Sequence, residues 1–282
     1  MEFVIVGTFD HTGFYETRLI LVLTGLLITF YKMSAARESR HLIIFLSSSV
    51  LMAGMEYVLQ AGGLRGPGYA FSLFGRVVPN VYGPLLQGIL EGGVCGLMGL
   101  WFADLWTSRA RLKEWVPYLL FACLVLSLAV FTGLLTKTQP VSSVQPIFSP
   151  TTILVITTII FFSLLVAWWK DELSILANFY AGLLIFALLN FEPLHLLGAR
   201  YVGLVEGAGT VRAGSFWQWT MMTLSYIYES AGGKLHYLMV PVALGLISSK
   251  LKSTDDSARL SYQHLQRLTE RGWRKKSKPF QR

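Results

Sequence analysis

The sequence predicts an all-α, polytopic transmembrane helical bundle of about seven spans, and three observations lead to this prediction. Hydrophobic residues make up 53% of the 282 residues and charged residues only 14%, whereas an ordinary soluble domain has about 25% charged residues. The apolar residues come in runs of roughly 18–25, the length that crosses a hydrocarbon core. The excess of positive charge is concentrated at the C-terminal end of the sequence.

Seven apolar stretches, each bounded by charges, Pro or Gly, are the expected spans. They are residues 17–33, 41–60, 80–105, 115–136, 150–169, 173–198 and 233–250. One more segment, residues 214–230, is apolar and aromatic but short for a span. We expect it to form either a re-entrant or interfacial helix, or the first part of a broken seventh span that runs to residue 249.

The basic residues indicate the orientation, because cytoplasmic loops carry an excess of Lys and Arg. Seventeen basic residues fall on one side of the predicted spans and seven on the other, the latter including Arg18, Arg200 and Lys234. The first side is therefore predicted to be cytoplasmic, with the N-terminus outside and the C-terminus inside. The membrane is expected to be the endoplasmic reticulum in a eukaryote or the inner membrane in a bacterium.

The C-terminal segment is predicted to be a separate unit, so that residues 1–250 form the membrane domain and residues 251–282 a basic, loosely amphipathic cytoplasmic tail. Residues 250–282 contain ten Lys/Arg and three Asp/Glu, a net charge of +7, while residues 1–249 carry 14 basic and 13 acidic side chains. Charge confined to the end of a membrane domain favours an anionic leaflet as its partner and argues against nucleic acid.

Ionisable side chains inside the spans are the main functional signal, because each costs roughly 2.5–3.5 kcal/mol at the centre of a spanning helix. Glu91 is the deepest, eleven residues into the third span. Gln87 lies one turn before it, and Gly88, Gly92 and Gly96 form a seam that predicts close approach of a second helix. A purely structural role for Glu91, as a protonated contact between two helices, stays open.

Further polar and aromatic residues fall in the outer half of the predicted bundle, where they are expected to line one cavity open toward the outer leaflet. The acids predicted to be catalytic are Glu56, Glu91, Glu192 and Glu229. The residues predicted to bind substrate are Tyr57, Gln87, Asn190, His195, Trp217, Trp219 and Tyr226. The alternative for the shallow members is that they are rim residues or part of an interfacial aromatic belt. Asp104, at the inner boundary beside Arg109, is predicted to be solvated.

No metal and no cofactor are expected. Glu192 and His195 form one ExxH pair, whereas a di-iron carboxylate bundle needs two such pairs and two further Glu. The sequence contains no CxxC, HExxH, GxSxG or P-loop pattern.

The acids predict an intramembrane enzyme that acts on a lipophilic, isoprenoid-like substrate by carboxylic-acid-initiated cyclisation or isomerisation. A carboxylic acid in an apolar site can stay protonated and donate to an alkene or epoxide, and aromatic rings can stabilise the resulting carbocation. Two alternatives remain open. Glu91 and the helix break at Gly232 and Gly233 are also typical of a proton-coupled transporter of a small or lipophilic solute. Lys234 suggests a seven-span receptor or photoreceptor.

The motif Met55-Glu56-Tyr57-Val58 in the second span, with Glu229 ahead of the seventh, resembles the layout of the integral-membrane terpene cyclases of fungal meroterpenoid pathways. The resemblance covers the topology and these two short motifs. It implies that Glu56 and Glu229 together open a prenyl epoxide and steer its cyclisation. The family usually has Trp before the first acid and Asp as the second, and Glu91 has no counterpart in its pattern.

Overall fold

The structure is a computed structural model that describes residues 2–8, 13–36, 39–61, 72–79, 81–141, 143–206 and 209–247. The chain divides into two units, Met1–Ile247 and Ser248–Arg282. The predicted basic tail, with its expected affinity for an anionic leaflet, and the end of the predicted seventh span lie outside the described residues.

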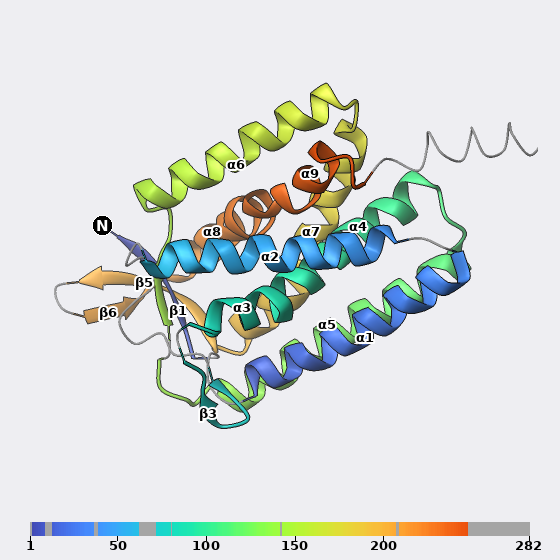
Figure 1. The fold of residues 1–282 in the computed structure, drawn as a ribbon. Coiled ribbons are helices and arrows are strands. Elements are labelled where there is room, and N and C mark those ends of the chain that lie inside the picture. The colour runs from blue at the N-terminus through green and yellow to red at the C-terminus, as the bar shows by residue number, and fades with distance from the viewer. Residues whose placement is uncertain are drawn as a thin grey trace, which may run out of the picture. The chain divides into compact units, whose positions relative to one another are not determined.

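The first unit is a polytopic helical bundle. In the part of the chain that the structure describes, six helices are long and apolar enough to cross a membrane. They are α1 (Phe14–Ala36), α2 (Arg40–Ala61), the run of α3 (Gly83–Gln87), η1 (Gly88–Gly93) and α4 (Val94–Thr107), then α5 (Leu112–Thr136), α6 (Pro150–Trp169) and α7 (Leu173–Leu196). These helices agree with the first six predicted spans to within a few residues at each end. Figure 1 shows α1 and α5 side by side, and α4 packs mainly on α7.

The helical segment predicted for residues 233–250 begins earlier in the structure. A helical run forms from α8 (Ser215–Ser225), the π-helical η2 (Tyr226–Ala231), the 3₁₀ turn η3 (Gly232–Lys234) and α9 (His236–Ala243). Residues 215–230 are therefore helical and continue into the segment predicted to begin at residue 233. This run is not among the six described helices that are long and apolar enough to cross a membrane, so the seventh span stays a prediction.

A four-stranded antiparallel sheet lies at one end of the bundle (Figure 1), and the sequence analysis did not predict it. The strands are β1 (Phe3–Gly7), β4 (Ser143–Pro146), β5 (Arg200–Glu206) and β6 (Gly209–Arg212), in the order β4-β1-β5-β6. Since β1 precedes α1, β4 joins α5 to α6 and β5 follows α7, the sheet ties together three connections at the same end. A small hairpin of β2 (Ser72–Leu73) and β3 (Arg76–Val77) lies between α2 and α3.

The predicted glycine seam forms the contact of η1 and α4 with α2. A methyl group added at Gly92 would lie 2.6 Å from Cβ of Met52 and 2.7 Å from the carbonyl oxygen of Ser48. One added at Gly88 would lie 2.9 Å from the backbone nitrogen of Ala53. Backbones this close exclude any side chain larger than hydrogen, so the prediction that this seam admits a second helix is confirmed.

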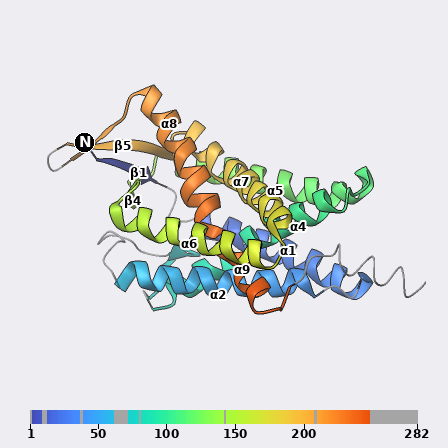
Figure 2. The same ribbon diagram turned by 90° about the horizontal axis from the view of Figure 1, so that it is seen from above.

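Helix α6 is the most exposed of the long helices. Only 17% of its most apolar window is buried inside the protein, against 72% for the run from Gly83 to Thr107. Figure 1 shows α6 along the upper edge of the bundle, and in the view from above (Figure 2) it appears between α2 and α7. It packs chiefly on α9 and η3. A helix that is apolar all round and largely unburied suits a lipid-facing position, and α6 also supplies one wall of the cavity described next.

Candidate functional site

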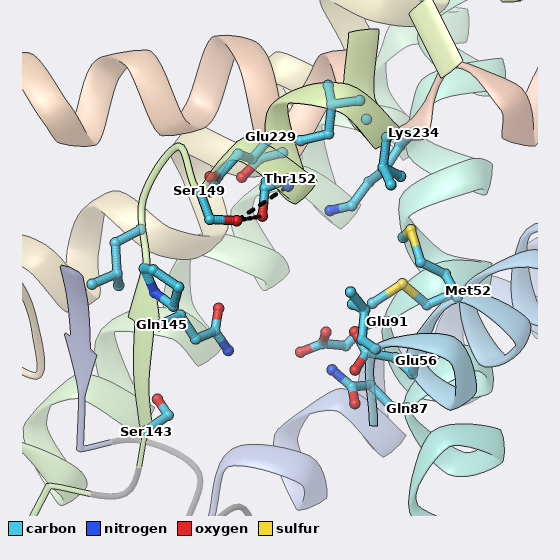
Figure 3. Close-up of a pocket in the computed structure, with 18 of the residues that line it drawn as sticks. Met52, Glu56, Gln87, Glu91, Ser143, Gln145, Ser149, Thr152, Glu229 and Lys234 are labelled. Atoms are coloured by element: carbon cyan, nitrogen blue, oxygen red, sulfur yellow. Dashed lines mark hydrogen bonds between the residues drawn. The ribbon is translucent and has the colours of Figure 1, made fainter. Parts of the chain in front are cut away.

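A cavity of about 250 Å³ opens inside the bundle next to the sheet (Figure 3). Its walls come from α1, α2, α3, η1, α6, α7, η2 and η3, with strands β1, β4 and β5 on the remaining side. Its polar and charged lining residues are Tyr15, Glu56, Gln87, Glu91, Ser143, Gln145, Ser149, Thr151, Thr152, Arg200, Glu229, Ser230 and Lys234. Its apolar lining residues include Ile5, Met52, Met55, Leu59, Val155, Ile156 and Phe191. The cavity is therefore amphipathic.

Glu56 is directed into the cavity by the helical period of α2. Met52, Glu56 and Leu59 recur at spacings of four and three, so they share one face of the helix, and all three line the cavity. Glu56 is only 1% exposed. Tyr57 follows it in the chain and points elsewhere: it is 41% exposed and its hydroxyl donates to the backbone carbonyl of Val81.

Glu91 and Glu229 both lie in π-helical segments, η1 and η2, of two different helical runs. Such segments are rare, and when they interrupt α-helices they are frequently found at functional sites. Figure 3 shows Glu91 beside Glu56 and Gln87 on one wall, with Glu229 across the cavity from them. The hydroxyl of Ser225, one turn earlier, donates to the Glu229 carboxylate over 3.1 Å. The structure thus brings together three of the four acids predicted from the sequence.

Two cations line the same cavity: Lys234, and Arg200, which the sequence analysis assigned only to the outer side of the bundle. Arg200, at the start of β5, is 7% exposed, and its guanidinium lies 4.5 Å from the ring centre of Phe191 and 5.6 Å from that of Tyr226. Lys234, in η3, points its ammonium group into the cavity (Figure 3). It also interacts with the buried thiol of Cys95.

A third cation, Arg18, is completely buried in α1, which the sequence analysis did not anticipate. None of its three guanidinium nitrogens has a hydrogen-bond partner among the described residues, and the group lies 4.5 Å from the ring centre of Phe14. Glu91 and Tyr15, which both line the cavity, act on it electrostatically. Because a buried charge is costly without a counter-charge, Glu91 is the described carboxylate that offsets it.

Several predicted site residues are absent from the described cavity wall. They are Tyr57, Asn190, Glu192, His195, Trp217, Trp219 and Tyr226. Trp217 and Trp219 are 39% and 52% exposed, and Trp217 packs 5.0 Å from the ring of Phe3 in the sheet. Asn190 is buried in α7, and its Oδ1 has no partner among the described residues.

Some of these residues instead form a layer behind Arg200. Nδ1 of His195 lies 3.2 Å from the backbone carbonyl oxygen of Arg200, and Trp219 meets the His195 ring edge-on at 5.3 Å. Tyr226 lies against the Arg200 guanidinium and also interacts with Glu192. The C-terminal end of α7 and the start of η2 therefore support a cavity residue rather than line the cavity.

The sequence signals for the remaining wall were weak. Ser143 and Gln145 come from β4, a short strand between two spans, and Ser149 with Thr152 forms the N-terminal cap of α6, where the Thr152 amide donates to the Ser149 hydroxyl over 3.1 Å. A Ser before Pro150 is a capping signal, and this cap was the one local feature that could have indicated these hydroxyls.

The arrangement suits proton transfer and the binding of a charged group. Carboxyl groups on opposite walls can act as donor and acceptor, and the cations can bind an anion. Within the described residues, no group of three or more His, Cys, Asp or Glu is arranged to hold a metal ion. No family model, no curated protein and no solved structure matches this chain.

Proposed function

We propose that the chain is an intramembrane enzyme that isomerises or cyclises a lipophilic, isoprenoid-like substrate by proton transfer from a carboxylic acid. The observation that carries the proposal is the meeting of Glu56, Glu91 and Glu229 in one cavity, with two of them on separate π-helical segments. Holding three acids in one enclosed site is costly, and two local departures from α-helical geometry that both bear an acid support a role in chemistry.

The position of the acids favours paired acid and base catalysis. Glu56 is almost completely buried on a face of α2 that it shares with Met52 and Leu59, and we assign it the role of proton donor. Glu229, which accepts a hydrogen bond from Ser225 on the far wall, is assigned the role of proton acceptor. A donor and an acceptor on opposite sides of a substrate suit the shift of a double bond, in which one proton is added and another removed.

The aromatic lining supports one of the two reaction types more than the other. A cyclisation that passes through a free carbocation profits from several aromatic faces around it. Tyr15 and Phe191 are the aromatic residues among the described lining, and Trp217, Trp219 and Tyr226 are not part of it. Isomerisation with closely coupled proton transfers therefore receives more support than a multi-step cyclisation.

The apolar part of the cavity supports a lipophilic substrate that arrives from the bilayer. Met55 and Leu59 of α2 face Val155 and Ile156 of α6 across this part of the lining. Val155 is 41% exposed on a helix that is otherwise little buried. This apolar part of the lining is where the hydrocarbon part of the substrate would lie.

The test is untargeted mass spectrometry of lipid extracts from cells with the gene, without it, and with single variants in its place. Loss of the gene and each of Glu56→Gln, Glu91→Gln and Glu229→Gln should cause the same lipid to accumulate. Glu114→Gln, an exposed acid in the first turn of α5, is the matched control and should leave the profile unchanged. An identical lipid profile in all strains, combined with solute flux into proteoliposomes, would contradict the enzyme proposal and favour a transporter.

A further inference from the structure

The two cations of the cavity point to the chemical class of the substrate's polar end. We propose that Arg200 and Lys234 together bind an anionic head group, a carboxylate or a phosphate ester, at one end of a single-chain lipophilic substrate. The proposal rests on the proposed function, because it takes one of the cavity acids to be protonated as the proton donor.

The balance of charge in the cavity leaves room for one negative charge. The described lining carries the acids Glu56, Glu91 and Glu229 and the cations Arg200 and Lys234. Arg18, buried behind the wall, offsets Glu91. With one acid protonated and Glu91 offset by Arg18, one lining carboxylate faces Arg200 and Lys234, while Glu192 lies outside the lining beside Tyr226. A low-dielectric site with a net positive charge favours an anionic ligand over a neutral or cationic one.

Arg200 is held as a preorganised anion-binding group. Its guanidinium packs on the rings of Phe191 and Tyr226, and its backbone belongs to β5, where Arg200 is opposite Gly7 of β1. The contact of His195 with its carbonyl oxygen fixes the same residue from the other side. A planar guanidinium in a fixed orientation suits a carboxylate or phosphate, which it can bind through two parallel hydrogen bonds.

Lys234 supplies a second, more adjustable charge to the same cavity. It follows Gly232 and Gly233 in the short 3₁₀ turn between η2 and α9, so its backbone position is set by the break in the helix. Its ammonium group has three donors that can reorient toward an oxyanion. The apolar side of the cavity, between α2 and α6, then receives the hydrocarbon chain.

Binding of matched single-chain probes to the full-length protein tests the proposal. The protein is placed in nanodiscs of zwitterionic lipid, and the affinities of dodecyl phosphate, dodecanoate, dodecanol and dodecyltrimethylammonium are measured. At least one anionic probe should bind about tenfold or more tightly than the alcohol or the cationic probe. Comparison of the phosphate with the carboxylate identifies which of the two head groups the site takes.

Variants separate the proposed contacts from general effects. Arg200→Gln and Lys234→Gln should each weaken binding of the anionic probe about tenfold or more. Arg200→Lys keeps the positive charge and should retain part of the affinity, so it serves as the second variant if Arg200→Gln does not fold. Arg212→Gln is the control, because Arg212 is exposed on β6 and packs on Tyr201 away from the cavity. Equal binding of all four probes, or anion binding that survives both Gln variants, would overturn the proposal.

The acid variants distinguish a failure of this inference from a failure of the proposed function. Glu56→Gln should keep or strengthen anion binding, because it removes no cation. If it also keeps the lipid profile of the wild type, the proposed enzyme role fails while the anion site stands. If Glu56→Gln accumulates the same lipid as loss of the gene, and the anionic probes do not bind to the wild-type protein, the enzyme role stands and the anionic head group is excluded.

Discussion

Arg40 on α2 and Asp104 on α4 form an ion pair at the end of the bundle away from the sheet, with Nη2 of Arg40 2.8 Å from Oδ1 and 2.7 Å from Oδ2 of Asp104. The two side chains are only 13% and 9% exposed, and Nε2 of His41 lies 3.5 Å from the same carboxylate. The prediction that Asp104 is a solvated residue is therefore wrong, since its partner comes from a different helix.

Replacement of Asp104 by Ala should destabilise the bundle strongly. It leaves Arg40 largely buried without its carboxylate, and breaking a buried pair by removing one partner typically costs about 3–5 kcal/mol. Thermal unfolding of the purified protein measures the effect. The double variant Arg40→Ala/Asp104→Ala should lose less than the sum of the single variants, and the exposed Lys113→Gln should change little. Additive losses would mean that the two residues stabilise the fold independently.

The glycine seam gives a second stability prediction with an internal control. Gly92→Ala should lower the thermal stability, because its methyl group would meet Met52 and the Ser48 carbonyl at less than van der Waals distance. Gly54→Ala, in the middle of α2, has no heavy atom within 4 Å of the added methyl group. It should be neutral or stabilising by up to about 1 kcal/mol, because Ala favours helix more than Gly does. Similar effects of the two substitutions would contradict the close packing.

The helices could be predicted from the sequence because a run of about 20 apolar residues has few alternatives to a buried or membrane-spanning helix. The same property hid the orientation of individual side chains. In a helix such as α6, which is apolar on every side, the sequence period does not distinguish a face toward lipid from a face toward another helix. The same holds for α1: the sequence placed Arg18 on the outer side but did not indicate that its side chain is completely buried.

The sheet and the π-helical segments were out of reach for a different reason. The strands have only four to seven residues, and their partners come from connections far apart in the chain, as in the pairing of Val4 with Pro146 and Gly203. A π-helical segment has no residue pattern of its own. The prediction that Glu91 and Glu229 line a cavity therefore depended only on the number of polar residues in the outer half of the spans. That count found Glu56, Glu91 and Glu229 but also included Trp217 and Trp219, which do not line the cavity.

The sheet end of the site should depend on Gln218 of α8. Its side chain is buried and pairs with both backbone groups of Val202 in β5: Oε1 accepts from the Val202 amide over 2.8 Å, and Nε2 donates to its carbonyl over 2.5 Å. Gln218→Leu leaves the Val202 amide without this partner, at a cost of about 1–3 kcal/mol, while the Val202 carbonyl keeps its hydrogen bond from the Ala213 amide.

Hydrogen exchange at the amide of Val202 should therefore become faster in Gln218→Leu, and the start of the same strand, which carries Arg200, should loosen with it. Thr223→Ala, an exposed change on the same helix, should leave the exchange unaltered. Unchanged protection of β5 in Gln218→Leu would mean that pairing with β1 alone holds the strand.

Substitution of Glu91 tests whether this residue acts in catalysis or only in the structure. As the deepest predicted acid, lying on a π-helical segment in the cavity wall, it should be essential: Glu91→Gln should abolish the turnover of the protein that folds. Glu56→Gln and Glu229→Gln should each cost roughly 10²-fold or more in turnover, whereas Glu192→Gln should cost less because Glu192 is not part of the described cavity wall. Product analysis in membranes supplied with the accumulated lipid gives the rates.

Arg18 provides the control for a purely structural role of Glu91. If Glu91 serves mainly as the counter-charge of the buried Arg18 guanidinium, Glu91→Gln will lower the yield, because an unpaired charge remains inside the bundle. The double variant Arg18→Met/Glu91→Gln, which removes both charges, will then recover the yield and also the turnover. A catalytic Glu91 predicts the opposite: the double variant folds but remains inactive, because no substitution at Arg18 can replace a carboxyl group that exchanges a proton with the substrate.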